Sequence, residues 1–192
     1  MFFLNNYKHY KNIRFGSFEY ALKEADKRSH KIIVETGVAR GKTKFFFFTR
    51  HNWKDGMSTL IFSNYADYVG GHLYSCDIDQ KNINNAKKFS QKFKKSITFV
   101  KDDSLNFLKK FKRKIDFLYL DALDGQFAEA SRHQLKEIQC AEDKLHSKSL
   151  VLLDDKETKT NLSVEYMLKK NFKIINETDE QILLSYKQTV FQ

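Results

Sequence analysis

Short apolar runs alternate along this chain with longer segments in which apolar residues recur at helical spacing. The apolar runs predict strands at residues 32–35, 72–76, 97–100, 115–120 and 149–153. The amphipathic segments predict helices over residues 18–28, 57–69, 82–93, 104–111, 127–145 and 162–170. Because strands and helices alternate, the pattern predicts an α/β fold around a mostly parallel sheet.

The pattern changes near the end of the chain. Strands are predicted at residues 172–175 and 181–186, and only residues 176–180 separate them. That connection is too short for a crossover helix, so the two strands should pair antiparallel. We therefore expect a seven-stranded, mostly parallel sheet with an antiparallel last strand. No repeat or linker divides residues 1–192, which predicts a single domain with residues 1–17 as an N-terminal extension.

A glycine-bearing loop follows the first predicted strand, where residues 31–43 read KIIVETGVARGKT. Two glycines let backbone amides approach a ligand closely. A phosphate-binding P-loop needs four residues between its first glycine and Gly-Lys-Thr, whereas Gly37 and Gly41 enclose three. Glu35 would repel a triphosphate but would accept hydrogen bonds from an ammonium group or a ribose. The loop therefore favours a nucleoside ligand, with a P-loop nucleotide hydrolase as a weaker alternative.

Acidic residues follow five of the predicted strands. They are Glu35, Asp77 with Asp79, Asp102 with Asp103, Asp121 with Asp124, and Asp154 with Asp155. The carboxyl ends of parallel strands meet at one edge of the sheet, where ligands bind. Carboxylates gathered there need a partner such as ligand hydroxyls, an ammonium group or a metal.

Two of these positions suggest contacts with a nucleoside. An acid in the position of Asp77, after the second strand, typically binds ribose hydroxyls, although it could cap the next helix. Asp103 and Ser104 could contact a base, and capping of the short helix is the alternative.

Three further carboxylates end neighbouring strands in the middle of the predicted sheet. Asp121, Asp154 and Asp155 could together hold Mg²⁺, with water completing its octahedral shell. Alternatively, Asp121 orders a substrate or the amine of a cofactor without any metal.

The net charge of +10 raises the question of a nucleic-acid partner. However, the basic clusters at residues 92–95 and 109–114 directly precede predicted strands, on the side of the sheet opposite the ligand edge. A solvated face is the favoured interpretation, and nucleic acid is a partner that we keep open without favouring it.

Other features of the composition bear on location. No apolar run approaches the roughly 20 residues of a membrane span, and the apolar start is too short for a signal peptide. Cys76 and Cys140 are expected to be free thiols of a cytoplasmic protein. The sequence leaves a homo-oligomer open.

Five motifs occur in the order found in class I S-adenosylmethionine-dependent methyltransferases. They are Glu35–Gly41 (ETGVARG), Leu73–Asp79 (LYSCDID), Val100–Ser104 (VKDDS), Phe117–Asp121 (FLYLD) and Val151–Asp155 (VLLDD). The resemblance covers residues 18–187 and is strongest to the catechol O-methyltransferase-like, metal-dependent O-methyltransferase branch. It implies a Rossmann-like three-layer sandwich, S-adenosylmethionine as cofactor, and Mg²⁺ as an optional second group.

The resemblance also implies roles for individual residues. Glu35 and Gly37 would bind the methionine end of the cofactor, Asp77 its ribose, and Asp103 with Ser104 its adenine. Thr36 and Ser58 would also bind the cofactor. The metal ligands would be Asp121, Asp154 and Asp155, and Asp121 would be the catalytic residue.

Two departures from the family pattern matter. The Gly-x-Ser-Thr that should open the first helix could be replaced by Gly41–Thr43, but Gly56–Thr59 (GMST) fits better. In that case residues 42–56, with Phe45–Phe48 and Trp53, form an inserted lid or substrate wall; the alternative is a first helix with core aromatics. In addition, no obvious general base follows Asp121, although Asp124, His133 and Lys156 are candidates. The helical pattern places His133 opposite the apolar face, so we expect a surface histidine without a role.

Taken together, these features predict a methyltransferase that methylates a hydroxyl of a small molecule or sugar, with the substrate hydroxyl bound to a metal that lowers its pKa. A nucleic-acid methyltransferase, suggested by the charge, is the alternative.

Overall fold

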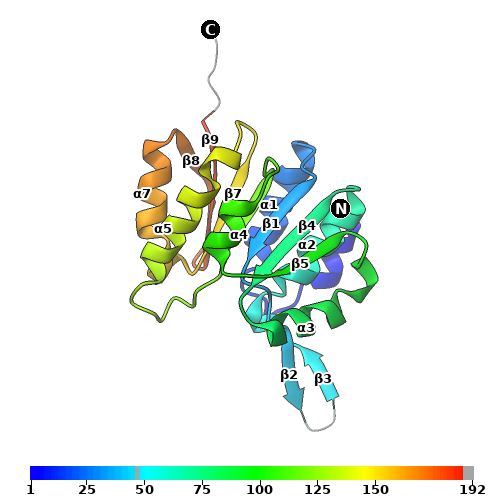
Figure 1. The fold of residues 1–192 in the computed structure, drawn as a ribbon. Helices are drawn as coiled ribbons and strands as arrows, with labels where there is room; N and C mark the ends of the chain where they lie inside the picture. Colours follow the sequence, from blue (N-terminus) through cyan, green and yellow to red (C-terminus); the bar gives the residue numbers. More distant parts are fainter. Residues whose placement is uncertain (46–47, 188–192) are drawn as a thin grey trace.

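The structure is a computed structural model that describes residues 1–45 and 48–187; for residues 42–45 and 48–51 it describes the backbone. Its centre is a seven-stranded sheet in the order β5-β4-β1-β6-β7-β9-β8 (Figure 1). The strands are β1 (Ile32–Thr36), β4 (His72–Asp77), β5 (Ile97–Lys101), β6 (Phe117–Leu120), β7 (Leu150–Asp154), β8 (Phe172–Glu177) and β9 (Gln181–Tyr186). The predicted fold class is confirmed.

Strand β9 is the reversed strand of this sheet. It pairs antiparallel with both β7 and β8, whereas β1, β4, β5, β6 and β7 pair in parallel. Every residue of β6 and β7 is buried, as expected for central strands covered on both faces. The short connection before β9 thus has the predicted effect on strand direction.

Helices cover both faces of the sheet (Figure 1). They are α1 (Phe15–Lys27), α2 (Ser58–Tyr68), α3 (Gln80–Phe89), α4 (Ser104–Lys110), α5 (Ala130–Ala141), α6 (Lys156–Lys159) and α7 (Asn161–Lys169). Short 3₁₀ helices lie at Phe2–Tyr7, Trp53–Asp55, Gln91–Phe93 and Glu142–Lys144. Among the described helices, none has the length and apolar character needed to cross a bilayer.

Two apolar cores lie on opposite sides of the sheet. Ile33 of β1 packs in the core that includes Phe18 of α1 and Phe62 of α2. The next residue, Val34, packs in the core that includes Ile138 of α5 and Met167 of α7. Successive residues of a strand point to opposite faces, so one strand supports both layers. This arrangement leaves the carboxyl ends of the strands as the edge where a ligand can approach.

Two further strands, β2 (Lys42–Phe45) and β3 (Phe48–His51), pair antiparallel with each other and project from the body of the molecule (Figure 1). The alternative of a first helix here is therefore wrong. The Gly-Lys-Thr sequence runs into β2, whereas a P-loop needs it at the start of a helix, so the phosphate-loop alternative is also wrong. The helix after β1 begins at Ser58, next to Gly56. Phe46 and Phe47, part of the predicted lid, lie outside the described residues.

Candidate active site

A hollow of about 130 Å³ opens at the carboxyl ends of β1, β4 and β5. Four of the predicted cofactor residues line it, namely Gly37, Asp77, Asp103 and Ser104. They come from three loops that are far apart in the sequence and that the parallel sheet brings to one edge. Leu123 and His133 close the hollow on the side of α5.

Asp77 is anchored to the glycine loop. Its Oδ2 atom accepts a hydrogen bond from the amide of Val38 at 3.1 Å, and its Oδ1 atom accepts one from the amide of Asp79 at 2.7 Å. The residue that caps α3 is Asp79, whose side chain accepts from the amide of Lys81. The capping alternative for Asp77 is therefore wrong. Burial raises the pKa of Asp77 above its ordinary value, although these amides lower it again.

Asp103 caps α4. Its Oδ1 atom accepts hydrogen bonds from the amides of Leu105 at 3.0 Å and Asn106 at 3.2 Å, so the capping alternative is correct for this residue. Ser104 lies beside it and shares a 2.9 Å hydrogen bond with Nε2 of His133 from α5. Both residues line the hollow.

His133 was not expected to have a role. His133 is half-buried and lies one helical turn from the buried Ala130 and Glu137, so the predicted surface position is wrong; α4 packs against α5 there and makes His133 part of the wall of the hollow. One turn further along α5, Glu137 is 1% exposed, and burial raises the pKa of its carboxyl group to about 7. Nothing in the sequence distinguishes Glu137 from an ordinary surface glutamate.

Glu35 lies behind the glycine loop and is completely buried. Its carboxylate accepts hydrogen bonds from the hydroxyls of Ser58 at 2.6 Å, Thr59 at 2.9 Å, and Ser75. Burial raises the pKa of Glu35 to about 7, even though the three hydroxyls lower it. Glu35 thus ties β1 to β4 and to the start of α2, and the predicted contact with the cofactor stays a prediction.

Thr36 and Ser58 are also at most 1% exposed. With Glu35, they form a group of predicted cofactor residues that does not line the hollow. Gly37 differs, because the chain turns there with φ of +81° and packs against the end of β6. A Cβ atom on Gly37 would lie 2.2 Å from the carbonyl oxygen of Asp121, so only glycine fits.

The carboxylates after β6 and β7 come together at the other end of the same edge. Asp121, Asp154 and Asp155 each offer an oxygen atom, and these atoms lie within 4.8 Å of one another. Asp155 has a left-handed backbone conformation with φ of +53°, a conformation that aspartate tolerates better than most residues. We refer to these three residues as the acidic triad.

Two cationic side chains hold the acidic triad. Nε of Arg14 lies 2.7 Å from Oδ1 of Asp154, and Nη2 of Arg14 lies 2.9 Å from Oδ1 of Asp155. Nζ of Lys159 lies 2.8 Å from Oδ1 of Asp121 and 3.0 Å from Oδ2 of Asp155. Lys159 is 1% exposed. Burial lowers its pKa, but the carboxylates of Asp121 and Asp155 outweigh this and raise it above the ordinary value.

Comparison with known proteins identifies the family. Residues 53–156 match the sequence profile described as a methyltransferase domain. The chain belongs to this methyltransferase family. It is an S-adenosylmethionine-dependent methyltransferase, as the motifs predicted. No curated protein matches the sequence.

Solved structures show the same fold. The SAH-bound methyltransferase PaMTH1 of Podospora anserina superposes with a TM-score of 0.64 at 13% identity, covering 88% of this chain and 77% of that one. SMU.1697c of Streptococcus mutans, solved in complex with SAH, gives 0.61 at 10% identity over 88% and 96%. An rRNA methylase of Streptococcus thermophilus gives 0.58 at 12% identity over 89% and 96%. At this level of sequence identity, the similarity shows that the fold is shared.

The surroundings of the acidic triad show whether the predicted Mg²⁺ could bind there. Three carboxylates suit this ion in their chemistry. However, Arg14 and Lys159 already donate to oxygens of all three carboxylates, and a divalent cation between these carboxylates would lie close to both positive charges. Gly125 also packs closely, because a Cβ atom there would lie 3.2 Å from Oδ2 of Asp155. The residues present do not fit a divalent ion while the two cations are in place.

Three segments with little sequence pattern meet around the triad. Nδ2 of Asn12 donates to the carbonyl of Gly56 at 3.1 Å, which joins the N-terminal segment to the start of α2. Arg40 forms two hydrogen bonds with Asp124, at 2.7 and 3.2 Å, which join the glycine loop to the loop after β6. Asp124 is therefore paired with a cation, and the third predicted base candidate, Lys156, is paired with the carboxylate of Glu177 at 2.8 Å.

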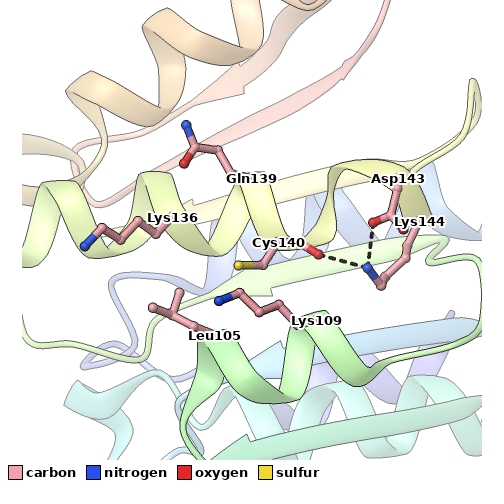
Figure 2. A pocket seen from close by; sticks show the side chains of 7 residues that line it. All are labelled: Leu105, Lys109, Lys136, Gln139, Cys140, Asp143 and Lys144. Carbon is pink, nitrogen blue, oxygen red and sulfur yellow. Dashed lines mark hydrogen bonds and ion pairs between the residues drawn. The ribbon is translucent and has the colours of Figure 1, made fainter.

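The methyltransferase has a second hollow, of about 440 Å³, between α4 and α5 (Figure 2). Lys109 and Lys136 extend along it, whereas Nζ of Lys144 donates to the carbonyl of Cys140 and pairs with Asp143. It contains none of the predicted site residues, and its lining is basic.

Proposed function

We propose that this methyltransferase transfers a methyl group from S-adenosylmethionine to a hydroxyl oxygen of a small molecule or sugar. The observation that carries the proposal is the anchored carboxylate of Asp77, which borders an open hollow beside the turn at Gly37. A carboxylate in this place can accept hydrogen bonds from two vicinal hydroxyls, as in a ribose.

The cofactor residues would have two kinds of role. Asp77 would bind the ribose, and Ser104 with His133 would contact the adenine from the walls of the hollow. Glu35 and Ser58 would act indirectly, by fixing the loop and the start of α2 through their mutual hydrogen bond. When bound, the cofactor supplies a methyl group on a positively charged sulfur.

Asp121 is the proposed catalytic residue. Its side chain is 32% exposed, so it can accept a hydrogen bond from an acceptor hydroxyl while Lys159 holds its other side. As the new oxygen–carbon bond forms and the carbon–sulfur bond breaks, the hydroxyl proton passes to Asp121 and then to water. Holding the two reactants in line supplies much of the acceleration. The position of Asp121 and the Asp154–Asp155 pair supports the catechol O-methyltransferase-like branch, without a step through metal.

The walls of the acceptor site are proposed to come from residues 1–17, 42–56 and 122–130. Two contacts support this assignment: Asn12 joins the first segment to the second at Gly56, and Arg40 joins the glycine loop to the third segment at Asp124. Strands β2 and β3 would then act as a lid within a single domain. Cys76 and Cys140 are free thiols, which supports a cytoplasmic location.

Calorimetric titration with S-adenosylhomocysteine tests the cofactor site. Wild type should bind, and Asp77→Ala should bind roughly 100-fold more weakly, because each hydrogen bond to a charged group contributes about 1.5–3 kcal/mol. Asp79→Ala is the matched control, since it removes a neighbouring carboxylate that caps α3. Unchanged affinity in Asp77→Ala would contradict the ribose assignment.

A nucleic-acid acceptor is the second candidate, supported by the net charge of +10 and by Lys109 and Lys136 on the second hollow. One of the similar structures is titled an rRNA methylase. This candidate predicts RNA binding that weakens steeply with salt and weakens further in Lys109→Gln/Lys136→Gln. Methylation of a small hydroxyl compound, with no RNA binding at low salt, would decide for the first candidate.

A further inference from the structure

We infer that Arg14 and Lys159 take the place of a divalent metal ion in the acidic triad, so that the methyltransferase works without metal and Lys159 positions Asp121. The part of this inference that concerns Asp121 rests on the proposed function. The part that concerns metal binding does not, because it follows from the contacts of the triad alone.

The charge balance is that of a metal site. Three carboxylates around one divalent cation carry a net charge of −1, and three carboxylates with one guanidinium and one ammonium carry the same charge. Three carboxylates so close to one another, with Asp154 buried, need such compensation. Glu180 lies further out, 3.6 Å from Nη2 of Arg14, with a side chain that is 32% exposed.

The geometry is also that of a bridge. Of the two cations, both contact Asp155, only Lys159 contacts Asp121, and only Arg14 contacts Asp154. Each cation thus joins two carboxylates, as a shared metal ion would.

Neutral donors occupy further positions around the acidic triad. The Gln181 amide donates to Oδ1 of Asp154 at 2.7 Å, and the Tyr119 hydroxyl donates to Oδ2 of Asp121 at 3.4 Å. Both residues are at most 1% exposed. These donors occupy positions beside the carboxylates that the ordered waters around Mg²⁺ would otherwise take.

The two cations come from parts of the chain that the fold must bring together. Arg14 directly precedes α1, and Lys159 lies in α6, one helical turn after Asp155. The side chain of Lys159 is 2% exposed, whereas that of Asp121 is 32% exposed. Lys159 therefore does not reach an acceptor in the crevice itself, and its effect on the reaction passes through the orientation of Asp121.

Titration of the full chain with Mn²⁺, followed by the electron paramagnetic resonance of the free ion, tests the inference. Wild type should show no saturable binding at millimolar Mn²⁺, with or without S-adenosylhomocysteine, and EDTA should leave methyl transfer unchanged. Stoichiometric Mn²⁺ binding that is lost in Asp154→Asn would overturn the inference.

Substitution of Lys159 gives a positive readout. Lys159→Met leaves Asp121 without its cation and Asp155 with Arg14 alone, so its unfolding temperature should fall, and Mn²⁺ should raise it again by binding to the opened triad. Lys159→Arg keeps the charge and should remain insensitive to Mn²⁺. Lys156→Met is the matched control, because Lys156 pairs with the exposed Glu177, and it should behave like wild type. If Lys159→Met does not fold even with Mn²⁺, the wild-type titration decides alone.

The proposed function and this inference fail in different ways. Loss of S-adenosylhomocysteine binding by wild type would remove the proposed function and leave the Mn²⁺ result as it stands. Binding of Mn²⁺ by wild type would remove the inference and leave the cofactor site intact.

Discussion

The two ends of the ligand edge contain the same kind of residue in different surroundings. At the hollow, the Asp77 carboxylate is held by backbone amides and borders open space. At the acidic triad, the carboxylates are held by the side-chain cations of Arg14 and Lys159. An acidic residue at the end of a strand therefore indicates a position at the ligand edge of the sheet. Whether its carboxylate can bind a ligand depends on whether side-chain cations already pair with it.

The largest expected difference between the two ends is in stability. Asp154→Ala should lower the free energy of unfolding by about 3 kcal/mol, because the buried Arg14 loses its 2.7 Å partner and keeps only Asp155 close by. Asp77→Ala should lower it far less, since burial already disfavours the charge of Asp77. Urea unfolding of both variants measures the contrast, and equal losses would mean that the two ends do not differ in this way.

The turn at Gly37 joins the two ends, and its substitution tests that connection. Gly37→Ala should cost more than the roughly 1–2 kcal/mol of a left-handed alanine, because its Cβ atom would also clash with the backbone of Asp121. Gly70→Ala is the control for conformation alone, as φ is +61° there and no atom lies within 4 Å of the added Cβ. Thermal unfolding and binding of S-adenosylhomocysteine should both be more impaired in Gly37→Ala. Matching behaviour of the two variants would argue against close packing at the loop.

Two buried glutamates near the hollow predict a dependence of stability on pH. Burial raises the pKa of Glu35 and of Glu137 from 4.5 to about 7, so the folded protein binds more protons than the unfolded chain between these values. Their contribution to stability is complete below pH 4.5 and is lost as the pH rises through about 7. Glu137→Gln should remove about half of this dependence in denaturant unfolding measured across the range. An unchanged slope would show that Glu137 keeps an ordinary pKa.

The smallest effect is expected at the rim. Asp124→Asn should cost about 0.2–1 kcal/mol, because Asp124 and Arg40 form an exposed pair. Cofactor affinity should change little, and any stability difference should shrink in high salt. A large loss of affinity would instead make this pair part of the cofactor site.

Much of this arrangement was predictable from local patterns. The reversed β9 followed from the five residues before it, and the positions of Asp77 and Asp121 followed from apolar runs that end in an acid. The start of α2 at Ser58 followed from the second glycine segment. These features depend on residues close together in the chain, which is why sequence reasoning reached them.

The residues that sequence reasoning missed act over long separations. Arg14 precedes its partner Asp154 by 140 positions, and no periodic pattern marks it. His133 becomes part of the hollow only because α4 packs against α5. Lys159 was accessible in principle, since a lysine four residues after an aspartate can pair with it on a helix. Three adjacent carboxylates need cations to balance their charge, and Lys159 is the one that lies close to them in the sequence.

Lys159 and Arg14 arrive with the chain itself, so the charges around the acidic triad are complete once folding ends. The activity of such a site would not depend on the concentration of divalent ions in the cell. A chelator or a shortage of magnesium would not reduce the activity, and binding of a wrong metal would not inhibit it. Its sensitivity lies elsewhere, in changes to the segment that contains Arg14, because a shift there would unbalance the site from outside the sheet.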